Sequence, residues 1–171
     1  MFRNPGQDYR SLFMKIGFFV PHFAEGGLER STLGLAEEIV RRGDEALLIT
    51  LNATGKMIKM WPCEDGLRVL HSTRTVTSIP ALSRVIRQEK IDALISAQDH
   101  ANITAVLART LSRSKVPLIL TERSFIHGSM KTRGWFRRMV LSRLMSCTYP
   151  RADVVVANSR AGARIVESYL G

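Results

Sequence analysis

The stretch that decides the fold runs from Lys15 to Thr50 and reads KIGFFVPHFAEGGLERSTLGLAEEIVRRGDEALLIT. Its first part, residues 16–20, is an apolar run of strand length, and a short loop with Gly26 and Gly27 joins it to an amphipathic segment that begins at Leu28. Two adjacent glycines allow the backbone to approach a ligand that a Cβ atom would obstruct, and the first turn of a helix presents N–H groups without intrahelical partners. The stretch therefore predicts a binding site for a phosphate group or a sugar.

The segment after the glycines has the spacing of a helix. Charged residues form the i,i+4 pairs Glu37–Arg41 and Glu38–Arg42, and Gly43 supplies a C-terminal stop. A second apolar run of strand length follows at residues 46–51, which completes one βαβ unit with parallel strands. The positions predicted to share the core-facing side of the helix are Leu28, Thr32, Leu35, Ala36 and Ile39.

The rest of the chain continues the alternation of strands and helices. Further strands are predicted at residues 67–70, 91–96, 116–121 and 153–157, with helices at 79–88, around 103–111, at 135–149 and at 160–170. This alternation predicts an α/β fold with a Rossmann-like, doubly wound parallel sheet. At 171 residues the chain suits one domain, which we place at residues 14–171 after a flexible, polar leader at residues 1–13.

Composition narrows the class of protein. Hydrophobic residues make up 45% and charged residues 23% of the chain, which are globular values. No apolar run approaches the roughly 18 residues of a membrane span, and no signal-peptide segment precedes the first strand, so we expect a cytoplasmic protein. Cys63 and Cys147 lie far apart without metal-ligand spacing, so we expect free thiols and no metal site.

Polar side chains follow the predicted strands at the points where the strands end. Ligands of doubly wound sheets bind at the carboxyl ends of the strands, so we expect these side chains to converge on one edge of the sheet. They are Asp99, His100, Asn102, Glu122, Arg123, Ser124, Asn158 and Ser159.

Four segments together resemble the retaining glycosyltransferases of family 4. The segment GGLERSTLGLAEEIVRRGDEALLIT is similar to the family's GGxER loop and the RRGxE turn that follows it. QDHANITAVLAR, VPLILTERS and RADVVVANSRAGARIV resemble later segments of the family, and all four occur in the family's order between about Lys15 and Gly171. Each segment alone is a weak signal, but their order makes the match specific.

The resemblance implies the N-terminal, acceptor-side domain of a two-domain GT-B enzyme. Such an enzyme moves a sugar from a nucleotide-sugar donor to a glycan or lipid-linked acceptor with retention, without a metal or other cofactor. Carried onto this sequence, Gly26 and Gly27 would contact the diphosphate or the transferred sugar, and Glu29 and Arg30 would shape the loop. The family holds the donor chiefly through a C-terminal GT-B domain, which would act with this chain in cis or in trans. We therefore expect the chain alone to be inactive, and we assign no general base.

Several of these residues also have structural interpretations. The glycine pair fits a simple tight turn, and Asp99 fits a helix cap beside His100 as well as a ligand site. His100 could instead hydrogen-bond a sugar hydroxyl or a phosphate oxygen. Arg123 stands where many relatives have histidine, and its planar guanidinium suits phosphate better than proton transfer. Glu122 could form an ion pair with Arg123.

A basic segment accounts for part of the formal net charge of +10. Residues 123–152 contain seven Lys or Arg and no Asp or Glu, interleaved with apolar residues. The pattern fits an interfacial segment on an anionic membrane surface, although Arg143 falls near Phe136 around an ideal helix, and a solvated basic face is the alternative. Membrane or lipid contact is predicted for Lys131, Arg133, Trp135, Phe136, Arg137 and Arg138. No RNA- or DNA-binding motif is present, so no nucleic acid is expected.

These observations predict half of a glycosyltransferase of cell-envelope or polysaccharide biosynthesis. It would be cytoplasmic, with a peripheral position at the inner face of the cytoplasmic membrane. The competing hypothesis is a noncatalytic Rossmann-like module that binds a nucleotide or phosphorylated ligand and acts through a partner protein. A NAD site is disfavoured, because GxGxxG is absent and Asn52 stands where an acidic residue would end the second strand.

Overall fold

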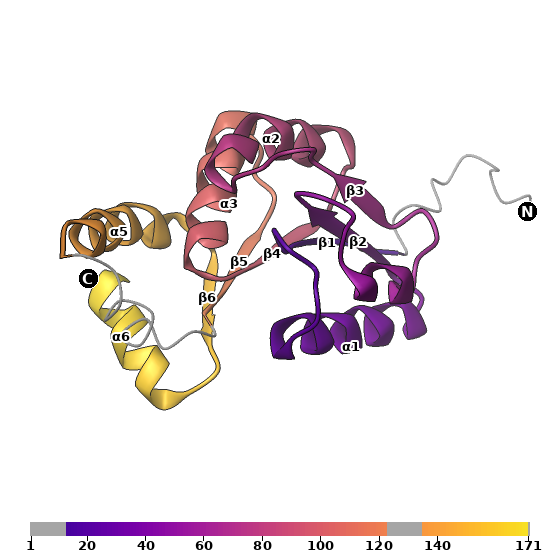
Figure 1. The fold of residues 1–171 in the computed structure, drawn as a ribbon, viewed down its shortest axis with the longest axis horizontal. Coiled ribbons are helices and arrows are strands. Elements are labelled where there is room, and N and C mark those ends of the chain that lie inside the picture. Colours follow the sequence, from indigo (N-terminus) through magenta and orange to yellow (C-terminus); the bar gives the residue numbers. More distant parts are fainter. Residues whose placement is uncertain (1–12, 123–134, 171) are drawn as a thin grey trace, which may run out of the picture.

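Six parallel strands form one sheet in the order β3-β2-β1-β4-β5-β6 in the computed structural model, which describes residues 13–122 and 135–170 (Figure 1). The first strand lies inside the sheet; the chain builds outward through β2 and β3 and then crosses to β4, β5 and β6 on the other side. Every pairing is parallel, which confirms the predicted doubly wound sheet. The strands are β1 (Lys15–Phe19), β2 (Glu45–Thr50), β3 (Leu67–Val69), β4 (Ala93–Ala97), β5 (Leu118–Glu122) and β6 (Val154–Ala157).

Helices connect successive strands, as the alternation in the sequence predicts. The bounds of α2 and α6 agree with the prediction, and the other predicted helices and the strands differ by a few residues at their ends. Three short 3-10 helices were not predicted, because each is too short to show a repeating pattern of apolar residues in the sequence. The helices are α1 (Gly27–Arg41), α2 (Ile79–Gln88), α3 (Asp99–Ser112), α5 (Trp135–Thr148) and α6 (Arg160–Leu170), with η2 (Lys56–Met60), η3 (Val76–Ser78) and η4 (Tyr149–Arg151).

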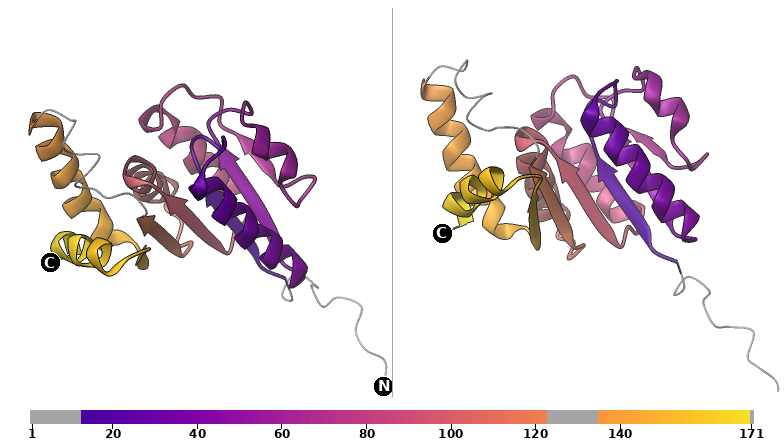
Figure 2. Two further views of the ribbon diagram at one scale, coloured as in Figure 1. Left: turned by 60° about the horizontal axis from the view of Figure 1, so that its bottom comes forward. Right: turned by 90° about the horizontal axis from the view of Figure 1, so that it is seen from below.

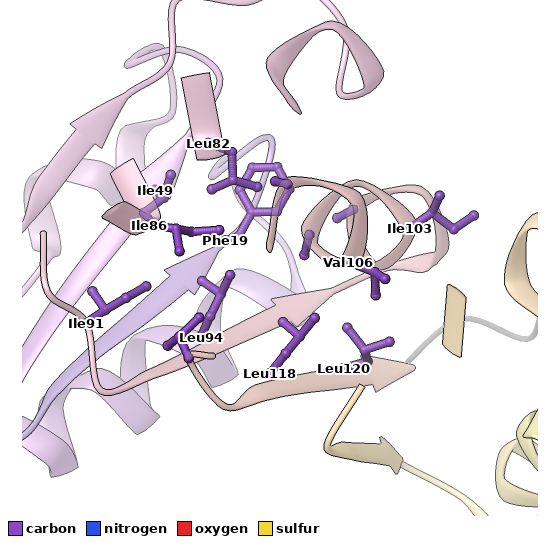
Figure 3. Packing of buried hydrophobic residues seen from close by; sticks show 14 of the residues in the cluster. Phe19, Ile49, Leu82, Ile86, Ile91, Leu94, Ile103, Val106, Leu118 and Leu120 are labelled. Carbon is purple, nitrogen blue, oxygen red and sulfur yellow. The ribbon is translucent and has the colours of Figure 1, made fainter. Parts of the chain in front are cut away.

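Side chains of the central strands alternate between two apolar layers. Phe18 and Leu48 belong to the layer under α1, whereas Phe19 and Ile49 belong to the layer under α2 and α3. The second layer also takes in Tyr149 of η4, and Figure 3 shows its side chains interlocking between strands and helices. Because both faces of the central strands are buried, these strands read as nearly continuous aliphatic runs.

One prediction about α1 is wrong. Leu35, which was expected to face the core, is 44% exposed, whereas Leu33 is buried. Leu35 borders an apolar groove of about 390 Å³ beside Ile95 and Ile119, where the described helices leave part of the sheet face open. The helical spacing fits two neighbouring faces of α1, and only the cover over β4 and β5 decides between them. The buried residues of α1 are Thr32, Leu33 and Ala36.

Of the two predicted charge pairs of α1, Glu38–Arg42 is confirmed and Glu37–Arg41 is replaced by another pair. Glu38 accepts hydrogen bonds from Arg41 Nη2 at 2.6 Å and from Arg42 Nε at 2.7 Å. Arg41 therefore pairs with Glu38 at i,i+3 spacing, where the sequence suggested Glu37. The hydrogen bonds from Arg41 and then Arg42 lower the pKa of Glu38 to about 2.

Helices α5 and α6 lie together at the β6 end of the sheet, away from α1 (Figure 2). They pack against each other and, through Met145 of α5 and Val166 of α6, against the larger apolar layer. The chain between β5 and α5, residues 123–134, lies outside the described residues.

Candidate functional site at the carboxyl edge of the sheet

The loop after β1 and the turn after β4 follow neighbouring strands at the carboxyl edge of the sheet. β1 pairs with β2 on one side and β4 on the other, so that Phe19 lies opposite both Ile49 and Ser96. The order of the strands reverses at this point, and ligands of doubly wound sheets bind in the crevice outside such a reversal. The predicted residues 26–30 and 99–100 begin the two helices that leave this edge.

The two glycines at the start of α1, Gly26 and Gly27, are not explained by backbone conformation or by packing against the rest of the fold. Gly26 has φ −167° and ψ 179°, an extended conformation that any residue adopts, and no side chain caps the helix. A Cβ atom at Gly27 would meet nothing within 4 Å, and one at Gly26 would meet only the carboxylate end of Glu29, at 2.5 Å. A tight turn therefore does not account for Gly27. The N–H groups of the first turn of α1 have no side-chain cap, and Gly27 places no Cβ atom beside them.

Glu29 and Arg30 lie in the first turn of α1. The Arg30 N–H donates to the Gly26 carbonyl oxygen at 3.1 Å, which closes the first helical turn. Glu29 places a negative charge near the positive end of the helix dipole. A bound anion would share this helix terminus with Glu29, so Glu29 would have to swing away from it or hydrogen-bond to a ligand hydroxyl.

A hollow of about 470 Å³ opens between the first half of α1 and η2. Its walls combine the apolar side chains of Leu33, Met57 and Met60 with charged residues at the rim, and Lys56 Nζ lies 3.2 Å from a carboxylate oxygen of Glu25. The volume lies within the range of small-molecule sites. The remaining lining residues are Arg30, Gly34 and Glu37.

The turn after β4 is held in an unusual backbone conformation. Gln98 has φ 87° and ψ 146°, a region that non-glycine residues rarely adopt and that costs roughly 1–3 kcal/mol. Two hydrogen bonds secure it: the Gln98 N–H donates to the Thr121 carbonyl at 3.3 Å, and the Asn102 N–H donates to the Gln98 carbonyl at 2.8 Å. Strain of this kind gathers at functional sites, where the surrounding structure stabilises it.

Asp99 and His100 form a pair at the start of α3. Asp99 Oδ1 accepts a hydrogen bond from the His100 backbone N–H at 2.6 Å and lies 2.8 Å from His100 Nδ1. The Asp99 side chain is 8% exposed, whereas that of His100 is 43% exposed. Asp99 therefore satisfies a donor of the first helical turn, as the capping interpretation predicts, and it also orients the imidazole. Nδ1 is committed to Asp99, and Nε2 remains as the second ring nitrogen.

A network of buried hydrogen bonds next to this edge connects β5, α3 and η4. Tyr149 Oη donates to Glu122 Oε2 at 2.8 Å and accepts from Asn102 Nδ2 at 3.2 Å, and Asn102 Nδ2 also lies 3.2 Å from the Thr121 carbonyl oxygen. Glu122 is 1% exposed, which gives its carboxylate a supporting position rather than an open one. Burial, followed by the negative charge of Glu122, raises the pKa of Tyr149. The sequence did not single out Tyr149, because it reads as one more residue at a helix end.

The remaining predicted residues lie in different places. Asn158 and Ser159 follow β6 and are exposed. Ser159 Oγ accepts a hydrogen bond from the Gly162 N–H at 3.0 Å, so it caps α6, a role that a serine before a predicted helix could have suggested. Arg123, Ser124, Lys131 and Arg133 lie outside the described residues, and so do the side chains of Phe136, Arg137 and Arg138. Within the described part of the chain, His, Cys, Asp and Glu side chains nowhere gather in threes that could hold a metal ion.

The family model described as Glycosyltransferase Family 4 matches residues 25–171, which is most of the chain. The chain belongs to Glycosyltransferase Family 4. The match begins at the glycine loop and continues through the β4–α3 turn and β6, so it includes the edge of the sheet described above. A search of curated protein sequences finds no significant match.

Solved structures share the fold of this family 4 chain at low sequence identity. MurG from Acinetobacter baumannii gives a TM-score of 0.56 at 13% identity over 85% of this chain and 42% of its own. An α-glucosyltransferase in complex with UDP and a 13-mer DNA containing a central A:G mismatch gives 0.55 at 14% identity, over 87% and 38%. A Listeria monocytogenes protein assigned as a UDP-N-acetylglucosamine 2-epimerase gives 0.58 at 12% identity, over 91% and 41%.

These likenesses identify the fold as one Rossmann-like domain of the GT-B architecture. The family 4 chain spans about 38–42% of the length of the three structures.

The family 4 chain exposes apolar side chains along α5. Trp135, Met139, Val140 and Leu144 are 76%, 48%, 40% and 41% exposed. Met145 of the same helix is instead fully buried in the core. Across residues 13–122 and 135–170, no helix combines the length and apolar composition needed to cross a bilayer.

Proposed function

We propose that this chain is the acceptor-side half of a retaining glycosyltransferase. It would act with a C-terminal GT-B domain, in cis or in trans, to move a sugar from a nucleotide-sugar donor to a glycan or lipid-linked acceptor. The observation that carries the proposal is Gly27, where no side chain caps the helix N-terminus and a Cβ would meet no atom of the described residues within 4 Å. A residue whose smallness the fold does not require suits a site where a ligand touches the backbone.

The residues at the carboxyl edge of the sheet would bind different parts of the substrates. The N–H groups that begin α1 would bind the donor's diphosphate or the transferred sugar, which stabilises the charge that develops on the leaving group. His100, fixed through Nδ1 by Asp99, would present Nε2 to a sugar hydroxyl or a phosphate oxygen. Arg123, directly after β5, would offer its guanidinium fork to phosphate. No step requires a general base from this chain.

The hollow between α1 and η2 would receive the acceptor. It begins beside the glycine loop, and its mixture of apolar walls and charged rim suits a sugar or lipid-linked group.

We also propose that the protein works at the cytoplasmic face of a membrane, in cell-envelope or polysaccharide biosynthesis. The exposed apolar residues of α5 stand in a segment without Asp or Glu, which suits contact with anionic lipid.

Sugar transfer from a panel of nucleotide sugars tests the function. The chain should be inactive alone and should transfer sugar when the C-terminal domain is joined to it. Activity of the chain alone would overturn the proposed division of donor binding between two domains. Tight binding of a nucleotide without transfer by the joined protein, with lipid-linked and soluble acceptors both tried, would favour a noncatalytic module.

A further inference from the structure

We propose that a pocket at the opposite, amino edge of the sheet binds a phosphate ester or diphosphate group. The pocket has a volume of about 470 Å³ and lies between the end of α3 and the starts of β5 and β6. It is far along the strands from the glycine loop, so it is a separate site and does not depend on the proposed transferase. Its lining residues are Arg109, Thr110, Arg113, Ser114, Lys115, Arg151 and Asp153.

The single carboxylate of this pocket is already engaged. Asp153 Oδ2 accepts a hydrogen bond from the Leu118 N–H at 2.7 Å and from Arg109 Nη1. Arg109 is fixed in turn, because Nη1 also donates to the Val116 carbonyl at 3.1 Å and Nη2 donates to the Arg151 carbonyl. The backbone hydrogen bond from Leu118 and the contact with Arg109 lower the pKa of Asp153, so this pair is charged and mutually neutral at pH 7.

Three cations remain around the neutral pair. Arg113, Lys115 and Arg151 are exposed, and among the described residues none of them forms an ion pair with a carboxylate. The negative end of the α3 dipole favours a cation at Arg113, which caps that helix, but it does not account for three charges around one concavity. Guanidinium and ammonium groups that converge on a hollow provide the donors that phosphate oxygens require.

The geometry of the pocket favours phosphate over a carboxylate ligand. Arg109 contacts Asp153 and donates to the carbonyl oxygens of Val116 and Arg151, so it ties the loop at Lys115 to the turn at Arg151, and both residues line the hollow. Three positive charges match the two to three negative charges of a phosphate monoester or diphosphate, whereas one carboxylate would leave two of them unpaired. The source of the group is either a soluble phosphate compound or an anionic lipid headgroup.

The test compares two triple variants that lose the same charge. The pocket variant carries Arg113→Gln, Lys115→Gln and Arg151→Gln, and leaves Arg109 and Asp153 in place. The control carries Lys59→Gln, Arg84→Gln and Arg87→Gln, all at exposed positions elsewhere. Binding of inorganic pyrophosphate is measured by calorimetry at about 0.1 M salt, where long-range attraction is largely screened. Sedimentation with phosphatidylglycerol–phosphatidylcholine vesicles forms the second arm.

The pocket variant should bind at least tenfold more weakly than both the parent and the control, in one arm or both. If the pocket variant loses pyrophosphate binding, the natural ligand is a soluble phosphate compound. If it loses only vesicle binding, the natural ligand is a lipid headgroup. Equal weakening in both triple variants would show attraction by net charge and would overturn the proposal, as would absence of binding by the parent in both arms. Gly27→Val should keep the pocket binding, which separates this site from the strand-end site.

Discussion

Gly27→Val separates a ligand-contact role of the glycine loop from a folding role. A side chain at this position meets open space, so the fold should accept it, whereas a ligand seated on the first turn of α1 would meet the new methyl groups. In the complete enzyme we expect turnover to fall at least a hundredfold. That corresponds to about 2.7 kcal/mol of lost transition-state binding, since each tenfold change is about 1.36 kcal/mol.

The stability of the Gly27 variants provides the internal check. Gly27→Ala should leave the chain as stable as the parent or stabilise it by up to about 1 kcal/mol, which is roughly 2–4 °C in Tm. Gly34→Ala is the matched control, because it also lies in α1 with no atom within 4 Å of the added Cβ, two helical turns further on. It should stabilise the chain by about 1 kcal/mol, and because Gly34 also lines the proposed acceptor hollow, it is a control for stability and not for turnover.

Gly55→Ala gives the contrasting case of a structural glycine. Its Cβ would lie 1.6 Å from the Phe23 carbonyl oxygen, so the loop after β1 would have to move and the melting temperature should fall. Circular dichroism melts and a sugar-transfer assay measure the whole set. Normal turnover of Gly27→Val would refute a ligand contact at the start of α1. Loss of turnover in both the Gly27 and the Gly34 variants would instead place the ligand contact in the hollow between α1 and η2.

Three further perturbations test other parts of the structure. Tyr149→Phe removes the hydroxyl that donates to Glu122 and should lower the free energy of unfolding by about 1–3 kcal/mol in urea titrations; an unchanged value would mean that the network of buried hydrogen bonds does not stabilise the edge. The lowered pKa of Asp153 means that its contribution to stability is present above the unfolded-state pKa and is lost as pH falls through the lower folded-state pKa. Asp153→Asn should therefore be less stable than the parent at pH 7, with a smaller difference in strong acid, and an equal difference at both pH values would contradict this assignment. Met139→Gln combined with Leu144→Gln should weaken binding to anionic vesicles without changing the melting temperature, because both side chains are exposed on α5; unchanged binding would remove the membrane contact of this helix.

The sequence was sufficient to predict the layers of this fold. Aliphatic runs, helical spacing and the glycine turn gave the parallel sheet and the helices between its strands, because each depends on residues close together in the chain. Which side of α1 would be covered could not be predicted. Leu33 and Leu35 are both apolar, and only the distribution of helices over β4, β5 and β6 exposes one and buries the other.

The candidate site was also predictable from the sequence only in part. The predicted strand ends placed Asp99, His100 and Glu122 at one edge of the sheet, because parallel strands have their carboxyl ends at the same edge. The support of Glu122 by Tyr149 joins residues 27 positions apart through a hydrogen bond, and no local pattern predicts that contact. The strained backbone at Gln98 also depends on the neighbouring strand, since Thr121 of β5 accepts its N–H.

Backbone amide shifts of the glycine loop test the central claim most directly. In the complete enzyme labelled with [¹⁵N]glycine, Gly27→Ala assigns the Gly27 signal, and nucleotide sugar is then added. The signals of Gly26 and Gly27 should move in proportion to donor occupancy, while those of Gly43 and Gly66, which precede β2 and β3 at the other edge, stay in place. Sugar transfer with unmoved Gly26 and Gly27 signals would contradict a ligand site at the start of α1.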